Sequence, residues 1–372
     1  MRSPRSSRLA IVDGWRTVAA FGVIWVHAWT HTGNPSLLLH LGSYSTNVER
    51  WFVLLGNGVD LFFVISGFCI SLTTTKNPIC RLSDYGQFIA HRWWRLTPAF
   101  YFVCLVTGIA VMATGGFVTL SEILAHLTWT FEWWPGTHSL APAFWSLQIE
   151  WQFYLTVPLL LALAKPKRQR WLLLVALLVI SFAWRGWSHS TPDGIAGAGS
   201  QHLPEYLAAF IWGIIVADFW RSQPAWFTRI KGWPFLILGL SLAYFGRGLS
   251  STEVFTTLRN FGVVAKTASH PFMTLGFAVM LAATLNGVRG LSAFLSTAPL
   301  QWAGKNSYSL YLWHWWPCLW IGHWVINFAG PTIGAHYTTL ALTLMVCCPL
   351  AWLTYRYCEK PYFNRKPKTN LA

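Results

Sequence analysis

The sequence predicts an all-α, polytopic membrane protein, and its composition is the reason. Hydrophobic residues make up 54% of the 372 residues, and the chain holds 25 Trp and 25 Phe. Asp, Glu, Lys and Arg together make up only 10%, against about 25% in an ordinary soluble domain. So few charges cannot cover the surface of a soluble protein of this size. An intrinsically disordered chain is also excluded, because disorder needs low hydrophobicity and high charge.

A helix that spans a bilayer needs about 20 mainly apolar residues, and about ten segments of the chain meet this requirement. They are residues 10–31, 57–75, 97–115, 143–164, 171–187, 204–221, 233–249, 270–286, 305–328 and 337–356. The basic N-terminus carries no cleavage site, so we expect a retained first helix that begins inside the cell. An even number of spans then places both termini in the cytoplasm.

The stretch 117–134 is only moderately apolar. We expect an outer interfacial or re-entrant helix there, with a count of nine or eleven spans as the alternative to ten. Trp129, Trp133 and Trp134 suit the headgroup level of the membrane. These tryptophans can serve either to stack on sugar rings or to form an ordinary interfacial belt.

The net charge of +15 fits membrane orientation better than nucleic-acid binding. Basic residues lie in short runs between apolar stretches, as in 165–170, which is the pattern of cytoplasmic loops. The exceptions, placed outside, are Arg50, Arg185, Arg247, Arg259 and Lys266. We therefore expect no nucleic-acid partner. The seven cysteines include no CxxC pair, so no disulfide framework or zinc finger is predicted. One transmembrane domain is expected over 1–372, with a core at 8–358 and a basic cytoplasmic tail at 359–372.

The first span carries three ionisable residues, Asp13, Arg16 and His27. Helix geometry puts Arg16 and His27 within about 20° of each other and about 16 Å apart along the axis. Asp13 lies one turn before Arg16 on the same stripe. One face therefore carries an ion pair near the inner surface and an imidazole near the outer surface. His31 follows one turn after His27, but there is no HExxH motif and no third ligand in register, so no metal site is predicted.

Two carboxylates are expected at the same outer level as His27. Asp60 follows Gly58 at the start of the second span, and Glu150 lies about two turns into the fourth. A carboxylate beside an imidazole can orient it and raise its basicity. Asp60 can also act simply as a helix cap.

Two further patterns place polar groups at particular helix faces. Arg92 and Arg95 lie three residues apart, which suits a phosphate clamp on the cytoplasmic side. Ordinary inside charge or lipid-headgroup binding explains the two arginines equally well. Tyr308, Tyr311 and His314 recur every three residues in the ninth span and form a polar stripe. The alternative for this stripe is a hydrogen bond between helices.

Together these landmarks resemble the integral-membrane acyltransferase family three, the acyl-CoA-dependent O-acyltransferases of cell-surface glycans. The matching motifs, in the family's order, are Asp13-Gly14-x-Arg16 with His27, Gly58-Val59-Asp60-x-Phe62-Phe63-Val64-x-Ser66-Gly67-Phe68, Arg92-x-x-Arg95-x-x-Pro98, Trp145-Ser146-Leu147-x-x-Glu150-x-x-Phe153-Tyr154, Ser307-Tyr308-x-x-Tyr311-x-x-His314 and Glu359-x-Pro361. Each motif is weak alone, but all six cover nearly the whole chain. Thr17 departs from the family, which often has Gly there, so close helix packing at this point is in question. The serine-hydrolase-like domain that some members carry is not expected here.

The resemblance implies a ten-helix core in the cell (inner) membrane that moves an acyl group, most often acetyl, from cytoplasmic acyl-CoA. Acyl-CoA would bind as a co-substrate rather than as a permanent cofactor. The acceptor would be a hydroxyl of an extracytoplasmic saccharide, such as a surface polysaccharide, a lipopolysaccharide or a lipid-linked glycan. Besides the lipid bilayer, acyl-CoA and this glycan are the expected partners.

The family's residue roles carry over onto matching positions only. Arg92 and Arg95 would hold the phosphates of coenzyme A, and Arg16 would neutralise charge at the inner mouth. His27 would act as the general base, with Asp60 or Glu150 orienting it and stabilising the imidazolium. The polar cavity would also include Asp13, Tyr308, Tyr311 and His314. Direct transfer is favoured over an acyl-enzyme, because no Ser or Cys in the sequence obviously pairs with His27.

Two other classes of protein fit part of the pattern. Buried ionisable residues also build the proton relays of transporters and exporters, although transporters commonly show two similar halves and no such repeat is found here. A non-catalytic assembly or lipid-binding protein would need none of the site residues. That class predicts that alanine at His27 and Arg95 is harmless.

Overall fold

The computed structural model describes residues 4–36, 38–41, 44–47, 52–133, 137–164, 166–190, 202–250 and 262–361. Its elements up to residue 190 are α1 (Pro4–His31), β1 (Leu38–Leu41), β2 (Tyr44–Asn47), η1 (Val53–Asn57), α3 (Gly58–Lys76), α4 (Leu82–Ala113), α5 (Leu120–Thr128), η2 (Pro142–Phe144), α6 (Trp145–Leu163) and α7 (Lys167–Ser190). The later elements are α8 (Leu203–Ser222), α9 (Ala225–Thr228), α10 (Trp233–Leu249), α12 (Gly262–Asn286), α13 (Leu291–Leu295), α14 (Ala298–Lys305), α15 (Ser307–Trp313), α16 (Trp315–Ala329), α17 (Ile333–Thr354) and the π-helical turn η3 (Tyr355–Glu359).

The chain forms two compact units whose segments alternate along the sequence, and each unit is described by itself. Unit 1 comprises Met1–Val23, Arg50–Cys80 and Ile149–Lys305. Unit 2 comprises Ile24–Glu49, Arg81–Gln148 and Asn306–Ala372. The predicted single domain, the cytoplasmic termini and the cytoplasmic tail remain predictions, and residues 362–372 of that tail lie outside the described part of the chain.

The predicted fold class is confirmed. By length and composition, six of the described helices can cross a membrane, and α10 is a shorter apolar helix. The first five are Leu54–Lys76, Leu82–Ala113, Lys167–Ser190, Leu203–Ser222 and Gly262–Asn286, and the sixth is Ile333–Glu359. A short antiparallel hairpin joins β1 to β2, with Leu38 opposite Asn47. The protein is thus an all-α, multi-pass integral membrane protein, while the count of ten spans stays a prediction.

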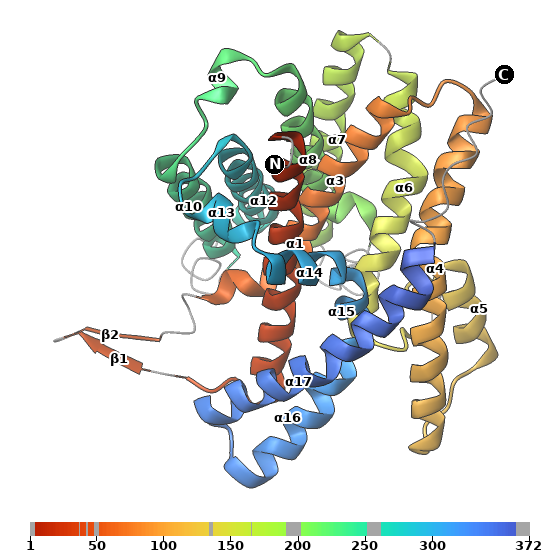
Figure 1. The fold of residues 1–372 in the computed structure, drawn as a ribbon, viewed down its shortest axis with the longest axis vertical. Coiled ribbons are helices and arrows are strands. Elements are labelled where there is room, and N and C mark those ends of the chain that lie inside the picture. The colour runs from red at the N-terminus through yellow and green to blue at the C-terminus, as the bar shows by residue number, and fades with distance from the viewer. Residues whose placement is uncertain are drawn as a thin grey trace. The chain divides into compact units, whose positions relative to one another are not determined.

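Unit 1 is built on helix pairs that pack at glycines. α3 packs on α8, and α10 packs on α12 (Figure 1). A Cβ on Gly213 would lie 1.9 Å from the carbonyl oxygen of Val64, and one on Gly67 would lie 2.0 Å from that of Phe210. Close backbone approach at small residues is the usual way that helices associate in lipid, where a hydrophobic driving force between them is missing. These two glycines therefore set the distance between α3 and α8.

The packing of α1 in unit 1 answers the question that Thr17 raised. Gly14 faces Leu295, and a Cβ on Gly304 would lie 2.1 Å from the carbonyl oxygen of Asp13. The Thr17 hydroxyl donates to the carbonyl oxygen of Leu300 at 2.5 Å. Thr17 therefore takes part in a close helix contact rather than preventing one.

Unit 2 corrects one element of the sequence prediction. The expected continuous span 305–328 is broken at His314 into α15 and α16. Pro317 is the physical reason, because it has no N–H for the carbonyl of Trp313 four residues earlier, and its ring clashes with that carbonyl. α16 then packs along α17 (Figure 1).

The stretch 117–134 contains a helix, α5, whose predicted outer position stays a prediction. One of the tryptophans of this stretch is not where we expected it. Trp129 follows α5 in a left-handed conformation, and only 1% of its surface is exposed. Its ring stacks on Phe100 at 4.3 Å. An aromatic cluster thus covers Trp129. This side chain neither belongs to an interfacial belt nor is accessible to stack on a sugar ring. Trp133 is 46% exposed, and Trp134 lies outside the described residues.

Glycine packing in unit 1 predicts a sharp contrast between two alanine substitutions. Gly213→Ala forces α3 and α8 apart and should lower the free energy of unfolding by about 1–3 kcal/mol, as overpacking does. Gly248→Ala meets nothing within 4 Å and should be neutral or stabilising by up to about 1 kcal/mol, because Ala is the better helix former. Thermal unfolding of both variants in the same detergent measures the difference. Equal midpoints would contradict the packing argument.

Candidate functional site

Two of the predicted site residues, Asp13 and Arg16, meet at one end of a polar cluster in unit 1. The Arg16 guanidinium pairs with Asp13 at 3.1 Å and donates to the sulfur of Cys69 at 3.5 Å. It also interacts electrostatically with Glu150 and Tyr154. Asp13 and Arg16 are three residues apart on α1, so the pair predicted from their spacing is present.

Glu150 accepts two hydrogen bonds at the other end of this cluster. The Ser66 hydroxyl donates to its Oε1 at 2.8 Å, and the Tyr154 hydroxyl donates to the same oxygen. Tyr154 lies one helical turn after Glu150 on α6, and Ser66 comes from α3. The carboxylate therefore joins α6 to α3 and holds two hydroxyl groups close to Arg16.

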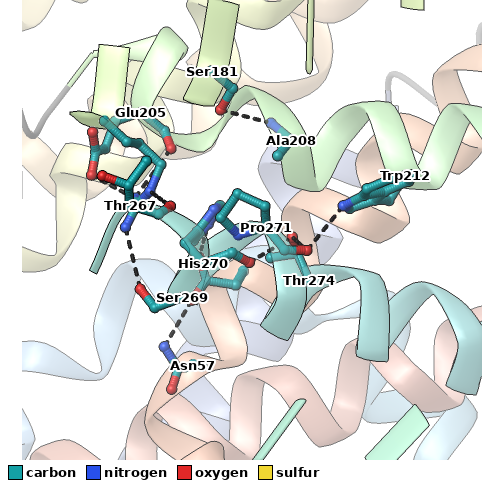
Figure 2. Close-up of polar contacts among 12 residues, drawn as sticks. Asn57, Ser181, Glu205, Ala208, Trp212, Thr267, Ser269, His270, Pro271 and Thr274 are labelled. Atoms are coloured by element: carbon teal, nitrogen blue, oxygen red, sulfur yellow. Dashed lines mark hydrogen bonds and ion pairs between the residues drawn. The ribbon is translucent and has the colours of Figure 1, made fainter. Parts of the chain in front are cut away.

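Asp60 binds a histidine that the sequence did not single out. His270 Nε2 donates to Asp60 Oδ1 at 2.9 Å, and the Asn57 amide donates to Oδ2 at 2.9 Å (Figure 2). Asp60 and His270 are 6% exposed. Because a carboxylate only accepts, the bond fixes the proton of a neutral His270 on Nε2 and leaves Nδ1 as the acceptor. Within the described residues, Nδ1 of His270 is buried without a hydrogen-bond partner.

A buried ion pair lies close to His270 (Figure 2). Arg185 on α7 binds Glu205 on α8 at 2.5 Å, and both are buried. Arg185 Nε also donates to the carbonyl oxygen of Thr267 at 3.0 Å. That carbonyl lacks its helical partner because the residue four positions on is Pro271. Arg185 thus binds the carbonyl oxygen that Pro271 leaves without a helical hydrogen bond in α12. This contact indicates a structural role for Arg185.

Sequence reasoning missed His270, Arg185 and Glu205 as a group. One signal was present: the predicted topology puts Arg185 on the side where positive charge is scarce. Such an exception is explained by a buried acidic partner, and Glu205 follows early in the next helix. His270 gave no comparable signal, because its partner Asp60 is 210 residues away in sequence.

Unit 2 contains the predicted base, His27, in a cluster of imidazole and indole rings. The His27 ring is half-buried. Its centroid lies 5.2 Å from that of His314, 4.7 Å from Trp315 and 6.3 Å from His31. The ring centroids of His31 and His323 in turn lie 6.3 Å apart. The cluster brings together His27 and His314, two of the predicted site residues, from α1 and the α15–α16 junction.

The tyrosines of the predicted polar stripe make hydrogen bonds within unit 2. The Tyr311 hydroxyl donates to the carbonyl oxygen of Ala143, so the Ser146 hydroxyl, 2.7 Å away, is the donor to Tyr311. The Tyr308 hydroxyl donates to the carbonyl oxygen of Leu96 at 2.9 Å. The hydrogen bonds between elements that we considered as the alternative for this stripe are therefore present.

Arg92 and Arg95 both lie on α4, as their spacing predicted, and both are partly exposed. The Arg92 guanidinium lies 5.3 Å from the centre of the Phe88 ring. Tyr308 binds the carbonyl of Leu96, next to Arg95, and so ties α15 to this part of α4. Among the described residues, no group of three or more His, Cys, Asp or Glu side chains is placed to hold a metal ion.

The structure therefore groups the predicted residues in two sets. Unit 1 holds Asp13, Arg16, Asp60 and Glu150, and unit 2 holds His27, Arg92, Arg95, Tyr308, Tyr311 and His314. Within unit 1, each carboxylate has a partner of its own. The orientation of His27 by Asp60 or Glu150 stays a prediction, as do the other catalytic roles.

Comparison with known proteins gives the family. The model of a family described as "Acyltransferase domain" matches residues 9–355. The chain belongs to this acyltransferase family. The match runs from the start of α1 to the beginning of η3 and so includes every predicted site residue.

Several curated members of the acyltransferase family are similar to the chain. The Bacillus subtilis protein YrhL is 26% identical over 381 residues, covering 94% of this chain and 54% of its own length. The peptidoglycan O-acetyltransferase OatA of Listeria monocytogenes is 26% identical over 394 residues, covering 97% and 57%. The O-acetyltransferase OatA of Staphylococcus aureus is 26% identical over 384 residues, covering 97% and 58%. The chain thus spans little more than half the length of these relatives.

Loss of the buried Arg185–Glu205 pair should destabilise the protein more than loss of an arginine that bonds to a nearby residue. Arg185→Met removes the arginine partner of the buried Glu205 carboxylate, which keeps His189 Nε2 at 3.5 Å, and frees the Thr267 carbonyl. Unfolding should therefore become easier by about 3–5 kcal/mol. The matched control is Arg247→Met, since the Arg247 side chain donates to the nearby Ser250 hydroxyl, and it should change stability by less than about 1 kcal/mol. Chemical denaturation in mixed micelles compares the two. A smaller effect at Arg185 than at Arg247 would overturn the assignment.

Proposed function

We propose that this protein is a membrane O-acyltransferase that moves an acyl group, most often acetyl, from cytoplasmic acyl-CoA to a hydroxyl of an extracytoplasmic saccharide. Membership of the acyltransferase family supports the reaction class. The names of two relatives, peptidoglycan O-acetyltransferase and O-acetyltransferase, support acetyl as the group and a cell-wall glycan as the acceptor class.

The observation that carries this proposal is the environment of His27. A general base needs a neutral imidazole whose lone pair is not already occupied. The ring contacts of His27 in the described part of unit 2 are with His31, His314 and Trp315, and none of these is a carboxylate or a permanent cation. Its partial exposure leaves the ring accessible to a substrate hydroxyl.

The remaining residues take roles suited to their charges. Arg92 and Arg95 bind the phosphates of coenzyme A, because guanidinium groups donate to phosphate oxygens in a fixed geometry. Arg16 neutralises further negative charge of the same co-substrate. Asp60 or Glu150 stabilises the positive charge that forms on His27 during transfer. In this proposal basic side chains bind coenzyme A, and a histidine accepts the proton of the acceptor hydroxyl.

The chemical step is a direct transfer. His27 takes the proton as the acceptor's O–H bond breaks, and the oxygen forms a bond to the acyl carbonyl carbon. The carbon–sulfur bond of the thioester then breaks, and the coenzyme A thiolate takes the proton from the imidazolium. The products are the O-acyl saccharide and free coenzyme A, and His27 is neutral again.

Replacing His27 tests the base assignment. His27→Ala should lower the rate of acetyl transfer by about 10²–10⁴-fold, the usual contribution of a general base, while the protein stays folded in membranes. The control is His323→Ala, because His323 is an exposed histidine of α16 and should leave the rate within about twofold. The measurement is release of free thiol from acetyl-CoA in the presence of a soluble peptidoglycan fragment. Full activity of His27→Ala would refute the role of His27.

Replacing Arg95 tests the coenzyme A site. Arg95→Ala should raise KM for acetyl-CoA about tenfold or more while leaving KM for the saccharide fragment unchanged, since one charge-assisted contact to phosphate is lost. The exposed Arg289 offers a matched control, and Arg289→Ala should alter neither constant. Steady-state kinetics with each substrate varied separately distinguishes the two constants. A rise confined to the saccharide KM would refute this assignment.

A further inference from the structure

His314 has a fixed protonation pattern because of where it lies in the chain. It stands at the break between α15 and α16, and none of its surface is exposed. Its Nδ1 lies 2.5 Å from the carbonyl oxygen of Tyr311. A carbonyl oxygen only accepts, so Nδ1 carries the proton. In the neutral ring the lone pair is then on Nε2, where it can accept one hydrogen bond.

That acceptor has no partner within the described part of the chain. Nε2 of His314 is buried and makes no hydrogen bond, and buried polar atoms are rarely left in this state. Two aromatic side chains contact the His314 ring, His27 and Tyr311, each with its centroid 5.2 Å away. The Tyr311 hydroxyl proton is already donated to the carbonyl of Ala143. Of the two, only His27 has an N–H group left to donate.

We infer that His314 is the positioning residue of His27. In the reacting complex Nε2 of His314 accepts a hydrogen bond from one ring nitrogen of His27, so the lone pair of the other nitrogen is directed to the acceptor hydroxyl. Catalytic hydrogen bonds are often long in the absence of substrate and tighten when it binds. A buried imidazole thus takes the orienting role that a carboxylate has in a Ser-His-Asp triad.

The arrangement also fits the charge changes of the proposed reaction, on which this inference rests. When His27 takes the proton of the acceptor hydroxyl, its N–H toward His314 becomes a stronger donor. The hydrogen bond to neutral His314 then becomes charge-assisted and stabilises the imidazolium. When the thiolate of coenzyme A takes the proton back, both rings return to their starting states. His314 gains and loses no proton in the cycle.

Three variants at two positions test the inference on the full chain in proteoliposomes, with acetyl-CoA and a soluble peptidoglycan fragment as substrates. His314→Met introduces an apolar side chain of similar length that has no nitrogen acceptor. It should lower kcat about 100-fold or more with little change in either KM. His314→Gln presents an amide oxygen that can accept from His27, and it should restore kcat to within about tenfold of the native value. His323→Met is the control for the same change at an exposed histidine of α16 to which the proposal gives no role, and it should leave kcat unchanged.

A double variant separates a positioning role from a structural one. If His314 acts only through His27, then His27→Ala/His314→Met is no slower than His27→Ala alone, because residues that act as a unit are non-additive. Native kcat in His314→Met, equal losses in the Met and Gln variants, or a further loss in the double variant would each overturn the inference. If His27→Ala itself keeps full activity, the assignment of His27 as the base fails, and the inference about His314 fails with it. The proposed function fails separately, if the native protein transfers no acetyl group from acetyl-CoA to the fragment.

Discussion

The hydrocarbon core of a membrane supplies no water, so each polar group inside this protein must find its partner in the chain itself. Pro271 shows the constraint most directly. It leaves the carbonyl of Thr267 without a helical N–H, and Arg185 reaches from α7 to bind that oxygen. Arg185 then needs a counter-charge, which Glu205 on α8 provides. One missing backbone proton thus accounts for a buried ion pair and joins three helices.

The same constraint distinguishes groups that support the fold from groups that can act on a substrate. Arg185 is fully used by its partners, and Glu150 holds two hydroxyl groups through one oxygen. Among the described residues, His314 makes a hydrogen bond through Nδ1 and none through Nε2. A buried acceptor without a hydrogen-bond partner costs free energy. We therefore expect the Nε2 acceptor of His314, beside the half-buried His27, to have a use. The proposed transfer reaction gives it one.

The sequence predicted the features that depend on local spacing. Helical periodicity placed Asp13 beside Arg16, and hydrophobic runs located the helices. It did not predict the break at His314, because the apolar run is continuous there and only Pro317 marks the discontinuity. The contact of Asp60 with His270 was also beyond reach, because His270 comes from a helix far along the chain. Pairings between distant segments depend on how helices pack, and spacing carries no information about that.

The central claim is that this chain transfers an acetyl group from coenzyme A to a saccharide hydroxyl. The most direct measurement uses proteoliposomes of the full chain, acetyl-CoA labelled with carbon-13 in the acetyl group, and a soluble peptidoglycan fragment analysed by mass spectrometry. The account predicts a labelled acetyl ester on the fragment that mild base removes, formed in step with free coenzyme A. Unlabelled fragment together with intact acetyl-CoA, from protein shown to be folded, would contradict it.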